Sequence, residues 1–429
     1  MKTYTPLERD TPVDPLAAIR AARQANNLPL AHDLLKAQAT KAGGQVSGLL
    51  AYEWALLLMA DKQYDEARDV LALFLASYPD LASAWFLLGQ CSEVQGDYVV
   101  AEGAFRESVR AHKRKHGQPD MARSYFSLGS NLFRLGRPLE AEDNWRKGLR
   151  GECSTPEALF VRSQVLLAFG DYEQGWKDYE NRRTLPGWQT SVRAFVGDRE
   201  LPPEWDGKSE GAVWVYGEQG AGDAIMFSRY TDHMPQYFGM GPRITLGPDL
   251  SEWLGNDSAK EPVWSVPVGS LPLKLGIVEP IPPSLIYEAP YKKPSNPKPR
   301  VGVCWKGASA HLNDKDRSSP IDFREALGDE RWEIVSLQYG YDFQPKDYRE
   351  TAELMRTLDA VISVDTSTIH VAGTLGVPTV LIPPASPEWR WGLGDTTPWY
   401  PSIKIVRRKR VDAWPEAIER AKQKLVEMI

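Results

Sequence analysis

Two segments of this 429-residue sequence carry residue types suited to binding an anion and moving a proton. The first is the glycine-rich run 217–223 (GEQGAGD), which follows an apolar stretch and precedes an expected helix. Its glycines, among them Gly220 and Gly222, allow a ligand to approach the backbone, and the amide groups at a helix start point toward such a ligand. Glu218 and Asp223 add two candidate proton acceptors. We interpret the run as a candidate binding loop; the alternative is a tight packing turn, because no Gly-Lys-Ser/Thr of a phosphate-binding Walker loop follows.

The second segment, 363–370 (SVDTSTIH), is expected to pass from a buried strand into a helix. A helix start suits a pyrophosphate, since its free amides and the helix dipole both favour an anion. An ordinary N-cap is the simpler role for Asp or Thr there, and the two roles are compatible. The candidate ligands are Asp365, Thr366, Ser367, Thr368 and His370. Of these, His370 lies one helical turn beyond Thr366.

Charged residues that follow the apolar run 301–305 are further candidate ligands. Lys306 and Arg317 are candidate cations for an anionic ligand, although either is compatible with an ordinary solvated side chain. Asp314 and Asp316 form a D-x-D pair of the kind that holds Mg²⁺ or Mn²⁺. Because the pair lies in a polar loop, where charge runs are usually solvated, we expect no metal site.

The second half of the chain alternates strand-like and helix-like patterns. Such alternation predicts parallel sheets with helices on both faces and ligands at the carboxyl ends of the strands. The proline-rich stretch 291–300 (YKKPSNPKPR) is expected to link a short first lobe, 212–290, to a second lobe, 301–429. The expected strands are 212–216, 243–246, 301–305, 333–337, 360–364 and 379–382, and the expected helices include 224–237, 348–358 and 414–428.

The first half contains an internal repeat. Tyr64 and Tyr98 are 34 residues apart, as are Ala67 and Ala101, and 34 is the tetratricopeptide period. The spacing predicts four to five helical pairs over 14–183, with a plain helical bundle as the alternative. Residues 1–13 are then an N-terminal tail and 184–211 a connector between the repeats and the first lobe. The concave side of such an array usually binds a peptide or a neighbouring domain.

Composition narrows the functional classes. The net charge of -6 gives no general attraction to nucleic acid or anionic membranes, although 404–410 (KIVRRKR) is locally basic. The three cysteines are far apart and predict neither a disulfide framework nor a zinc site, which favours a reducing, cytoplasmic location. The longest apolar stretch, 49–60, is too short to span a bilayer and contains Glu53, so we expect no membrane span and no exported leader.

Several segments together resemble the bacterial tetratricopeptide-repeat proteins that end in a glycosyltransferase domain related to the heptosyltransferases, an architecture similar to that of O-GlcNAc transferases. The resemblance implies a GT-B fold, in which two Rossmann-like lobes enclose a cleft and the second lobe binds a nucleotide-activated sugar. Such enzymes are usually metal-independent and many invert the anomeric centre, so that no cofactor is expected beyond the donor substrate. The matching segments are 170–180 (GDYEQGWKDYE), 204–207 (EWDG), 217–230 (GEQGAGDAIMFSRY), 317–320 (RSSP), 335–338 (VSLQ), 362–370 (ISVDTSTIH) and 395–401 (DTTPWYP).

The resemblance also implies roles for individual residues. Asp223 corresponds to the candidate general base, and Glu218 is the reserve candidate. Gln338 and the segment 389–391, which begins with Trp389, are expected nearer the nucleoside or the sugar. The expected diphosphate ligands are Lys306, Arg317, Thr366, Ser367 and Thr368.

The leading hypothesis is therefore an α-solenoid followed by α/β lobes that transfers a sugar from a nucleotide-diphosphate donor to an acceptor hydroxyl. The repeats would bind a protein or glycan acceptor or another partner. The chain departs from the family in one respect: about 84 residues separate Tyr216 from Arg300, so the first lobe is abridged. Two alternatives stay open, an inactive scaffold with a degenerate transferase domain and, with less support, a DNA-base glycosyltransferase. Sugar, nucleotide, acceptor and oligomeric state are left undetermined.

Overall fold

The computed structural model describes residues 16–41, 48–114, 120–185, 187–234, 262–283, 291–309, 311, 313–386 and 388–429. Contacts divide the chain into two compact units, Met1–Ser124 and Tyr125–Ile429. The division falls inside helix α7 (Met121–Arg134), so the later helical pairs belong to the same unit as the strands. The expected repeat region over 14–183 therefore spans both units.

The first unit consists of consecutive helical pairs whose close packing depends on small residues. Ala67 and Ala101, which mark the repeat in the sequence, are both fully buried. Gly89 lies against Phe105, where an added Cβ would come within 2.5 Å of the ring. The helices are α1 (Ala17–Gln24), α2 (Leu28–Lys41), α3 (Gly48–Ala60), α4 (Tyr64–Ser77), α5 (Ala82–Gln95) and α6 (Tyr98–Arg114). The predicted tandem helical pairs are confirmed.

The second unit begins with further helical pairs of the same kind. Gly129 lies against Trp145 and Gly148 against Phe126, again at distances that a Cβ would make too short. Thr155 caps the third helix, since its hydroxyl accepts a hydrogen bond from the amide of Ala158 at 3.3 Å. The elements are α7, α8 (Pro138–Leu149), α9 (Pro156–Ala168), α10 (Tyr172–Tyr179), η1 (Glu180–Thr184) and α11 (Trp188–Val196).

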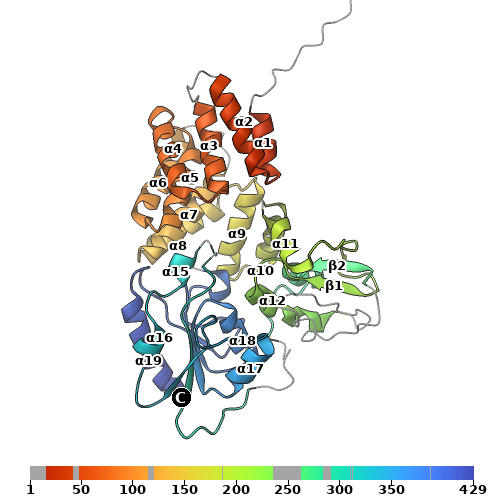
Figure 1. The fold of residues 1–429 in the computed structure, drawn as a ribbon, viewed down its shortest axis with the longest axis vertical. Helices are drawn as coiled ribbons and strands as arrows, with labels where there is room; N and C mark the ends of the chain where they lie inside the picture. Colours follow the sequence, from red (N-terminus) through yellow and green to blue (C-terminus); the bar gives the residue numbers. More distant parts are fainter. Residues whose placement is uncertain are drawn as a thin grey trace, which may run out of the picture. The chain divides into compact units, whose positions relative to one another are not determined.

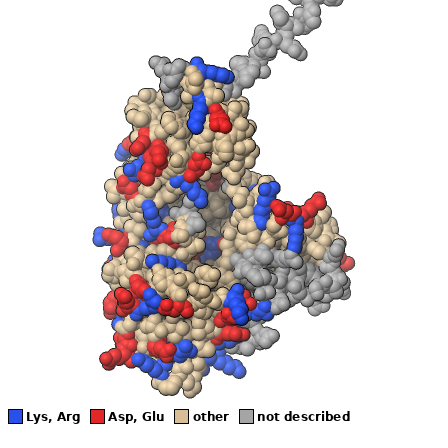
Figure 2. All heavy atoms as spheres, viewed as in Figure 1, with Lys and Arg blue, Asp and Glu red and all other residues tan. Residues whose placement is uncertain are grey.

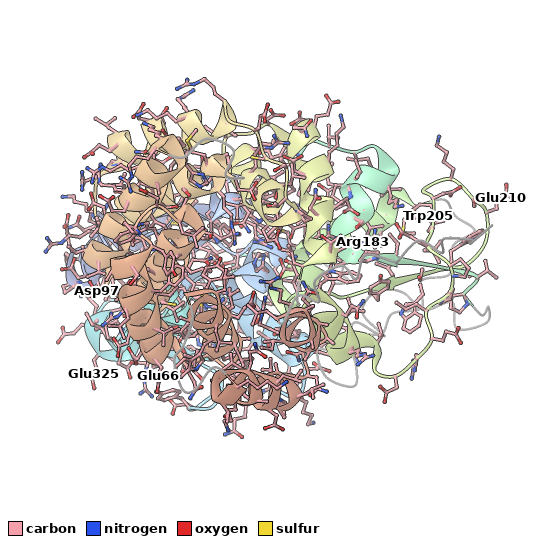
Figure 3. The ribbon with its side chains drawn as sticks, turned by 90° about the horizontal axis from the view of Figure 1, so that it is seen from above. Glu66, Asp97, Arg183, Trp205, Glu210 and Glu325 are labelled. Carbon is pink, nitrogen blue, oxygen red and sulfur yellow. The ribbon has the colours of Figure 1, made fainter. Side chains whose placement is uncertain are left out.

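The first lobe is small. Its described strands, β1 (Val213–Tyr216) and β2 (Trp264–Pro267), pair in parallel, with Val213 opposite Trp264. The expected strand at 243–246 lies outside the described residues. The helix after the glycine loop begins at Ala221 rather than at residue 224, because the loop itself enters the first turn; the helical elements are α12 (Ala221–Phe227), η2 (Ser228–His233), η3 (Val268–Ser270) and α14 (Leu271–Leu275). Figure 3 labels Trp205 and Glu210 in the segment that precedes β1; Trp205 is buried and Glu210 is exposed.

The second lobe is a five-stranded parallel sheet in the order β4-β3-β5-β6-β7. Its two faces are covered by different helices, α16 and α19 on one and α17 and α18 on the other (Figure 1). The strands are β3 (Arg300–Cys304), β4 (Glu333–Ser336), β5 (Ala360–Val364), β6 (Thr379–Ile382) and β7 (Ile403–Ile405), and the covering helices are α16 (Phe323–Ala326), α17 (Tyr348–Arg356), α18 (Ser367–Leu375) and α19 (Trp414–Met428). The direction of winding reverses between β3 and β5, and such a switch point is where open α/β sheets bind ligands at the carboxyl ends of their strands.

The proline-rich stretch 291–300 lies against the second lobe. Tyr291 donates its hydroxyl hydrogen to the carbonyl of Leu358 at 3.0 Å, and the amide of Asn296 donates to Asp359 at 2.7 Å. The expected linker thus contacts the second lobe at Tyr291 and at Asn296.

The basic run 404–410 is engaged by its own chain. Arg407 donates to the carbonyls of Trp391 and Gly392, and Lys409 pairs with Glu416. On the face drawn in Figure 2, cationic and anionic side chains are interspersed and do not form a patch of one sign. Within the described residues, no helix has both the length and the apolar character needed to cross a bilayer.

Candidate functional site

The two segments singled out from the sequence lie side by side. Helix α12 packs against helix α18, and Gly222 faces the imidazole of His370 so closely that an added Cβ would lie 2.6 Å from Cδ2. A side chain at position 222 would therefore separate the two helices. The glycine loop of the first lobe and the hydroxyl-rich helix of the second lobe are therefore neighbours in the second unit, and together they make the candidate site.

The start of α18 is open to an anion. Thr366 occupies the N-cap position in extended conformation, but its hydroxyl does not cap the helix. The hydroxyl of Ser367 instead accepts a hydrogen bond from Tyr348 at 2.8 Å. Without a side-chain cap, the first-turn amides keep their partial positive charge available for a ligand.

Arg317 places a cation beside this helix start. It ends the short helix α15 (Asp314–Arg317), and its guanidinium lies directly against Gly307, where an added Cβ would force the guanidinium to move. Its Nε is buried and, within the described part of the chain, has no hydrogen-bond partner. The same guanidinium is near enough to Asp365 to oppose the rise in that carboxyl's pKa. A buried donor of this kind can be satisfied by an anion or by an ordered water.

Gln338 organises the loop after β3. Its side-chain oxygen accepts hydrogen bonds from the amides of Trp305 at 3.1 Å and Lys306 at 2.8 Å, and its Nε2 donates to the carbonyl of Lys306 at 3.1 Å. The Gln338 amide is therefore used within the loop, and we revise its expected contact with nucleoside or sugar to a positioning role. The Lys306 side chain itself is exposed.

Asp223 lies in the first turn of α12 and joins the two lobes. One carboxylate oxygen accepts the amide hydrogen of Gly220 at 3.1 Å, and the other pairs with the guanidinium of Arg390. Arg390, in η4 (Trp389–Trp391), also pairs with Glu388. The sequence analysis did not single out Glu388 or the charge of Arg390; the available signal was the Glu-Trp-Arg-Trp run that follows a buried strand.

The guanidinium of Arg390 interacts electrostatically with three carboxyl groups, those of Asp223, Glu388 and Asp365. Burial raises the pKa of Glu388 to about 7, opposed by Arg390 and reinforced by Asp365 and Asp223. Burial likewise raises the pKa of Asp365, opposed by Arg317 and Arg390. The site therefore holds a carboxyl group that exchanges its proton near neutral pH, a property typical of functional sites.

His370 has a packing role. It is 4% exposed, its Nδ1 lies 2.9 Å from the Tyr400 hydroxyl, and its ring lies 5.3 Å from that of Trp391. Burial lowers its pKa well below the ordinary value, so the imidazole is neutral at neutral pH. We therefore revise its expected role from phosphate ligand to spacer between α18 and α12.

Glu218 has no lone pair to spare for catalysis. Its carboxylate accepts two hydrogen bonds from Arg182, at 2.9 and 2.6 Å, one from Trp188 at 2.7 Å and one from the amide of Gly269 at 2.9 Å. The residue is 2% exposed. This buried network connects the first lobe to η1, a segment that Figure 3 marks with the adjacent Arg183. We revise the reserve-base assignment to a structural one.

Trp389 belongs to the hydrophobic core. It is 4% exposed and packs edge-on against Trp176, with ring centroids 5.4 Å apart, and against Trp399. No face of the ring is open to a nucleoside, so we revise its expected ligand contact. Its ring packs against Arg390, whose guanidinium lies 4.2 Å from the ring centroid in a cation–π contact.

The two carboxylates of the D-x-D run have separate partners. Asp314 accepts a hydrogen bond from Ser318, whereas Asp316 is fully buried and pairs with arginines. The described residues contain no group of three or more His, Cys, Asp or Glu side chains placed to hold a metal ion.

Comparisons with known proteins agree with the repeat prediction. Residues 52–116 match the tetratricopeptide repeat family, which confirms the repeat. Protein FlbA of Caulobacter vibrioides is 24% identical over 421 residues, covering 83% of this chain and 69% of that protein.

Similar solved structures include a mutant O-GlcNAc transferase of Thermobaculum terrenum, with a TM-score of 0.34, 10% identity and coverage of 96% of this chain and 92% of that one. The MamA protein gives a TM-score of 0.29 and 14% identity, and covers 44% of this chain and 96% of its own.

Proposed function

We propose that the second unit binds a nucleotide-diphosphate sugar and transfers the sugar to an acceptor hydroxyl. The observation that carries the proposal is the Arg317 guanidinium, which has a buried Nε without a partner among the described residues. Its charge acts on the carboxyl group of Asp365, which directly precedes the N-cap residue of the uncapped helix α18, at the switch point between β3 and β5. A diphosphate is the ligand whose charge and size match a guanidinium, a set of helix amides and a nearby lysine.

The cost of an unpaired buried donor supports an anionic occupant. Leaving one such group unsatisfied costs about 1–3 kcal/mol, and more when the group is charged. A phosphate oxygen at this position would satisfy Arg317, accept from the first-turn amides of α18 and lie within reach of the flexible Lys306 side chain. The leaving diphosphate would be stabilised by the same fixed charges as negative charge develops on it, without a metal ion.

Asp223 is the proposed general base. In the transfer, the acceptor oxygen forms a bond to the anomeric carbon, the bond between that carbon and the diphosphate oxygen breaks, and the hydroxyl proton passes to Asp223. Arg390 of the second lobe pairs with Asp223 across the site, which orients the carboxylate. The helical repeats would present a protein or glycan acceptor, since such arrays bind extended segments.

A thermal-stability screen tests the donor class. A ligand that binds only the folded state raises its stability, so UDP-, GDP-, ADP- or CMP-linked sugars are compared for the rise in unfolding temperature. The best nucleotide is then titrated by calorimetry into the double variant Thr366→Ala with Lys306→Ala. We expect binding to weaken by at least about tenfold, because the variant loses one hydroxyl contact and one charge-assisted contact. Unchanged affinity would exclude the placement of the diphosphate at the start of α18.

A scaffold without catalysis is the second candidate, and the small first lobe favours it. Its described strands number two, against five in the second lobe. A scaffold predicts no stabilisation by any nucleotide sugar. The DNA-base alternative loses support because the run 404–410 is engaged within the chain, for example through Arg407 and the carbonyl of Trp391.

A further inference from the structure

Asp316, half of the D-x-D run, is a buried carboxylate placed between two arginines from distant parts of the chain. Its residue exposure is 0%. One oxygen lies 2.6 Å from Nη2 of Arg408, and the other lies 3.3 Å from Nε of Arg134. Burial favours the neutral acid, but Arg408, Arg134 and the amide donors outweigh it and lower the pKa of Asp316, so the carboxylate is ionised.

The same carboxylate fixes the loop that follows strand β6. Its oxygens accept the amide hydrogen of Ala385 at 2.7 Å and both the amide and hydroxyl hydrogens of Ser386 at 2.9 Å. The loop 385–386 leads to Glu388 and Arg390, which pair with each other at the candidate site. Asp316 is also the residue immediately before Arg317, and Arg408 binds its main-chain carbonyl as well as its side chain.

Arg134 connects helix α7, one of the helices of the repeat type, to Asp316. It ends α7, and its main-chain carbonyl accepts the amide hydrogen of Val411 at 2.9 Å. Gly136, with φ of +78°, approaches the carbonyl of Lys409 so closely that an added Cβ would lie 2.8 Å from it. The end of α7 is thus held against 409–411 by its backbone, independently of the Arg134 side chain.

From this arrangement we propose that Asp316 is a positioning residue through which Arg134 of helix α7 sets the position of Arg317, so that the end of α7 and the anion site are energetically coupled. The effect on ligand binding rests on the proposed function. The positioning of Arg317 by Arg134 and Asp316 does not. Removal of the Arg134 side chain leaves Asp316 paired with Arg408, so the fold is kept while one of the contacts that fix α15 is lost.

Arg134→Met is the decisive variant, and Arg137→Met is its matched control. Arg137 lies in the turn after α7 and pairs with Glu140 at the surface. UDP, or the nucleotide diphosphate that most stabilises the protein, is titrated by calorimetry. We expect about fivefold to twentyfold weaker binding for Arg134→Met, partial rescue in Arg134→Lys, and no change for Arg137→Met. Equal affinity in all four proteins would overturn the coupling to ligand binding.

A double-mutant cycle separates positioning through Arg317 from general weakening. In an Arg317→Ala background, Arg134→Met is expected to cause no further loss of affinity, because the group that it positions is already gone. The same loss in both backgrounds would mean that Arg134 acts elsewhere, and would contradict the inference.

Amide hydrogen exchange tests the structural part without a ligand. The amides of Arg317 and Ser318 donate within α15, to Asn313 at 3.1 Å and Asp314 at 2.8 Å. Arg134→Met should accelerate exchange at these two amides, while Arg137→Met should not. If the wild type binds no nucleotide diphosphate, the proposed function fails. If Arg134→Met leaves the exchange rates in α15 unchanged, the positioning inference fails. The two failures are therefore distinguishable.

Discussion

Asp223 and Arg390, 167 residues apart in the sequence, form an ion pair that connects helix α12 of the first lobe to η4 of the second. The pair places the candidate base at the junction of the two lobes, where a donor and an acceptor would meet. It also means that the carboxylate is held by a cation supplied by the other lobe. The catalytic proposal therefore depends on two lobes and not on the glycine loop alone.

Asp223→Asn should separate catalysis from folding. Asparagine is also a good helix-capping residue, so the contact with the amide of Gly220 is kept and the variant should fold. We expect normal affinity for the nucleotide sugar and a loss of turnover of at least about a hundredfold, the usual scale for a general base. Release of nucleoside diphosphate measures it, and near-normal turnover would remove Asp223 from the mechanism.

Gly222→Ala should disturb the packing of the two site helices. The added Cβ would lie 2.6 Å from Cδ2 of His370, a buried ring that cannot move away freely. We expect a loss of about 1–3 kcal/mol in the free energy of unfolding, from overpacking. Gly103→Ala is the control, since nothing lies within 4 Å of a Cβ there, and it should be neutral or stabilising by up to about 1 kcal/mol. Equal effects in urea denaturation would argue against close packing at Gly222.

Glu218→Gln should act on stability. Neutralising Glu218 breaks a buried ion pair and leaves Glu180 as the other carboxylate paired with Arg182, so we expect a cost of up to about 3–5 kcal/mol. The exposed Glu210, which precedes β1, provides the control, Glu210→Gln, with an expected change within about 0.5 kcal/mol. Denaturant unfolding measures both. A stable but inactive Glu218→Gln protein would restore Glu218 as a catalytic candidate.

Glu388 should make stability depend on pH between about 4.5 and 7. Its pKa is raised in the folded protein to about 7, so the folded state holds the proton more tightly than the unfolded chain. The stabilisation is present below the unfolded pKa and is lost as pH rises through the folded one. Relative to Glu388→Gln, wild-type unfolding free energy should fall with pH in this window by at most about 1.4 kcal/mol per unit. Parallel curves for the two proteins would contradict the raised pKa.

Periodic patterns predicted the fold well because they report local packing. The 34-residue spacing of Tyr64 and Tyr98 identified the helical pairs, and the apolar runs at 301–305 and 360–364 identified strands at the switch point. The start of α12 was predicted three residues late, since a glycine loop gives no apolar signal for its first turn.

Site residues were harder to predict because their roles depend on long-range partners. Glu218 is occupied by Arg182 and Gln338 by the backbone of Lys306, and neither pairing has a sequence signal. Glu388 was missed for the same reason: its raised pKa follows from burial beside Asp365, which only the fold brings near. The glycine loop and the start of α18 were found because both are local strand-to-helix turns.

Calorimetric titration of Arg317→Ala tests the central claim most directly. The nucleotide diphosphate that best stabilises the wild type is titrated into wild type, Arg317→Ala and Arg331→Ala, the last being an exposed arginine of the same lobe that pairs with Asp329. The account predicts a loss of affinity of about tenfold to a hundredfold for Arg317→Ala, the range for one charge-assisted contact, and unchanged affinity for Arg331→Ala. Equal affinity in all three proteins, or no binding by the wild type to any nucleotide diphosphate, would contradict it.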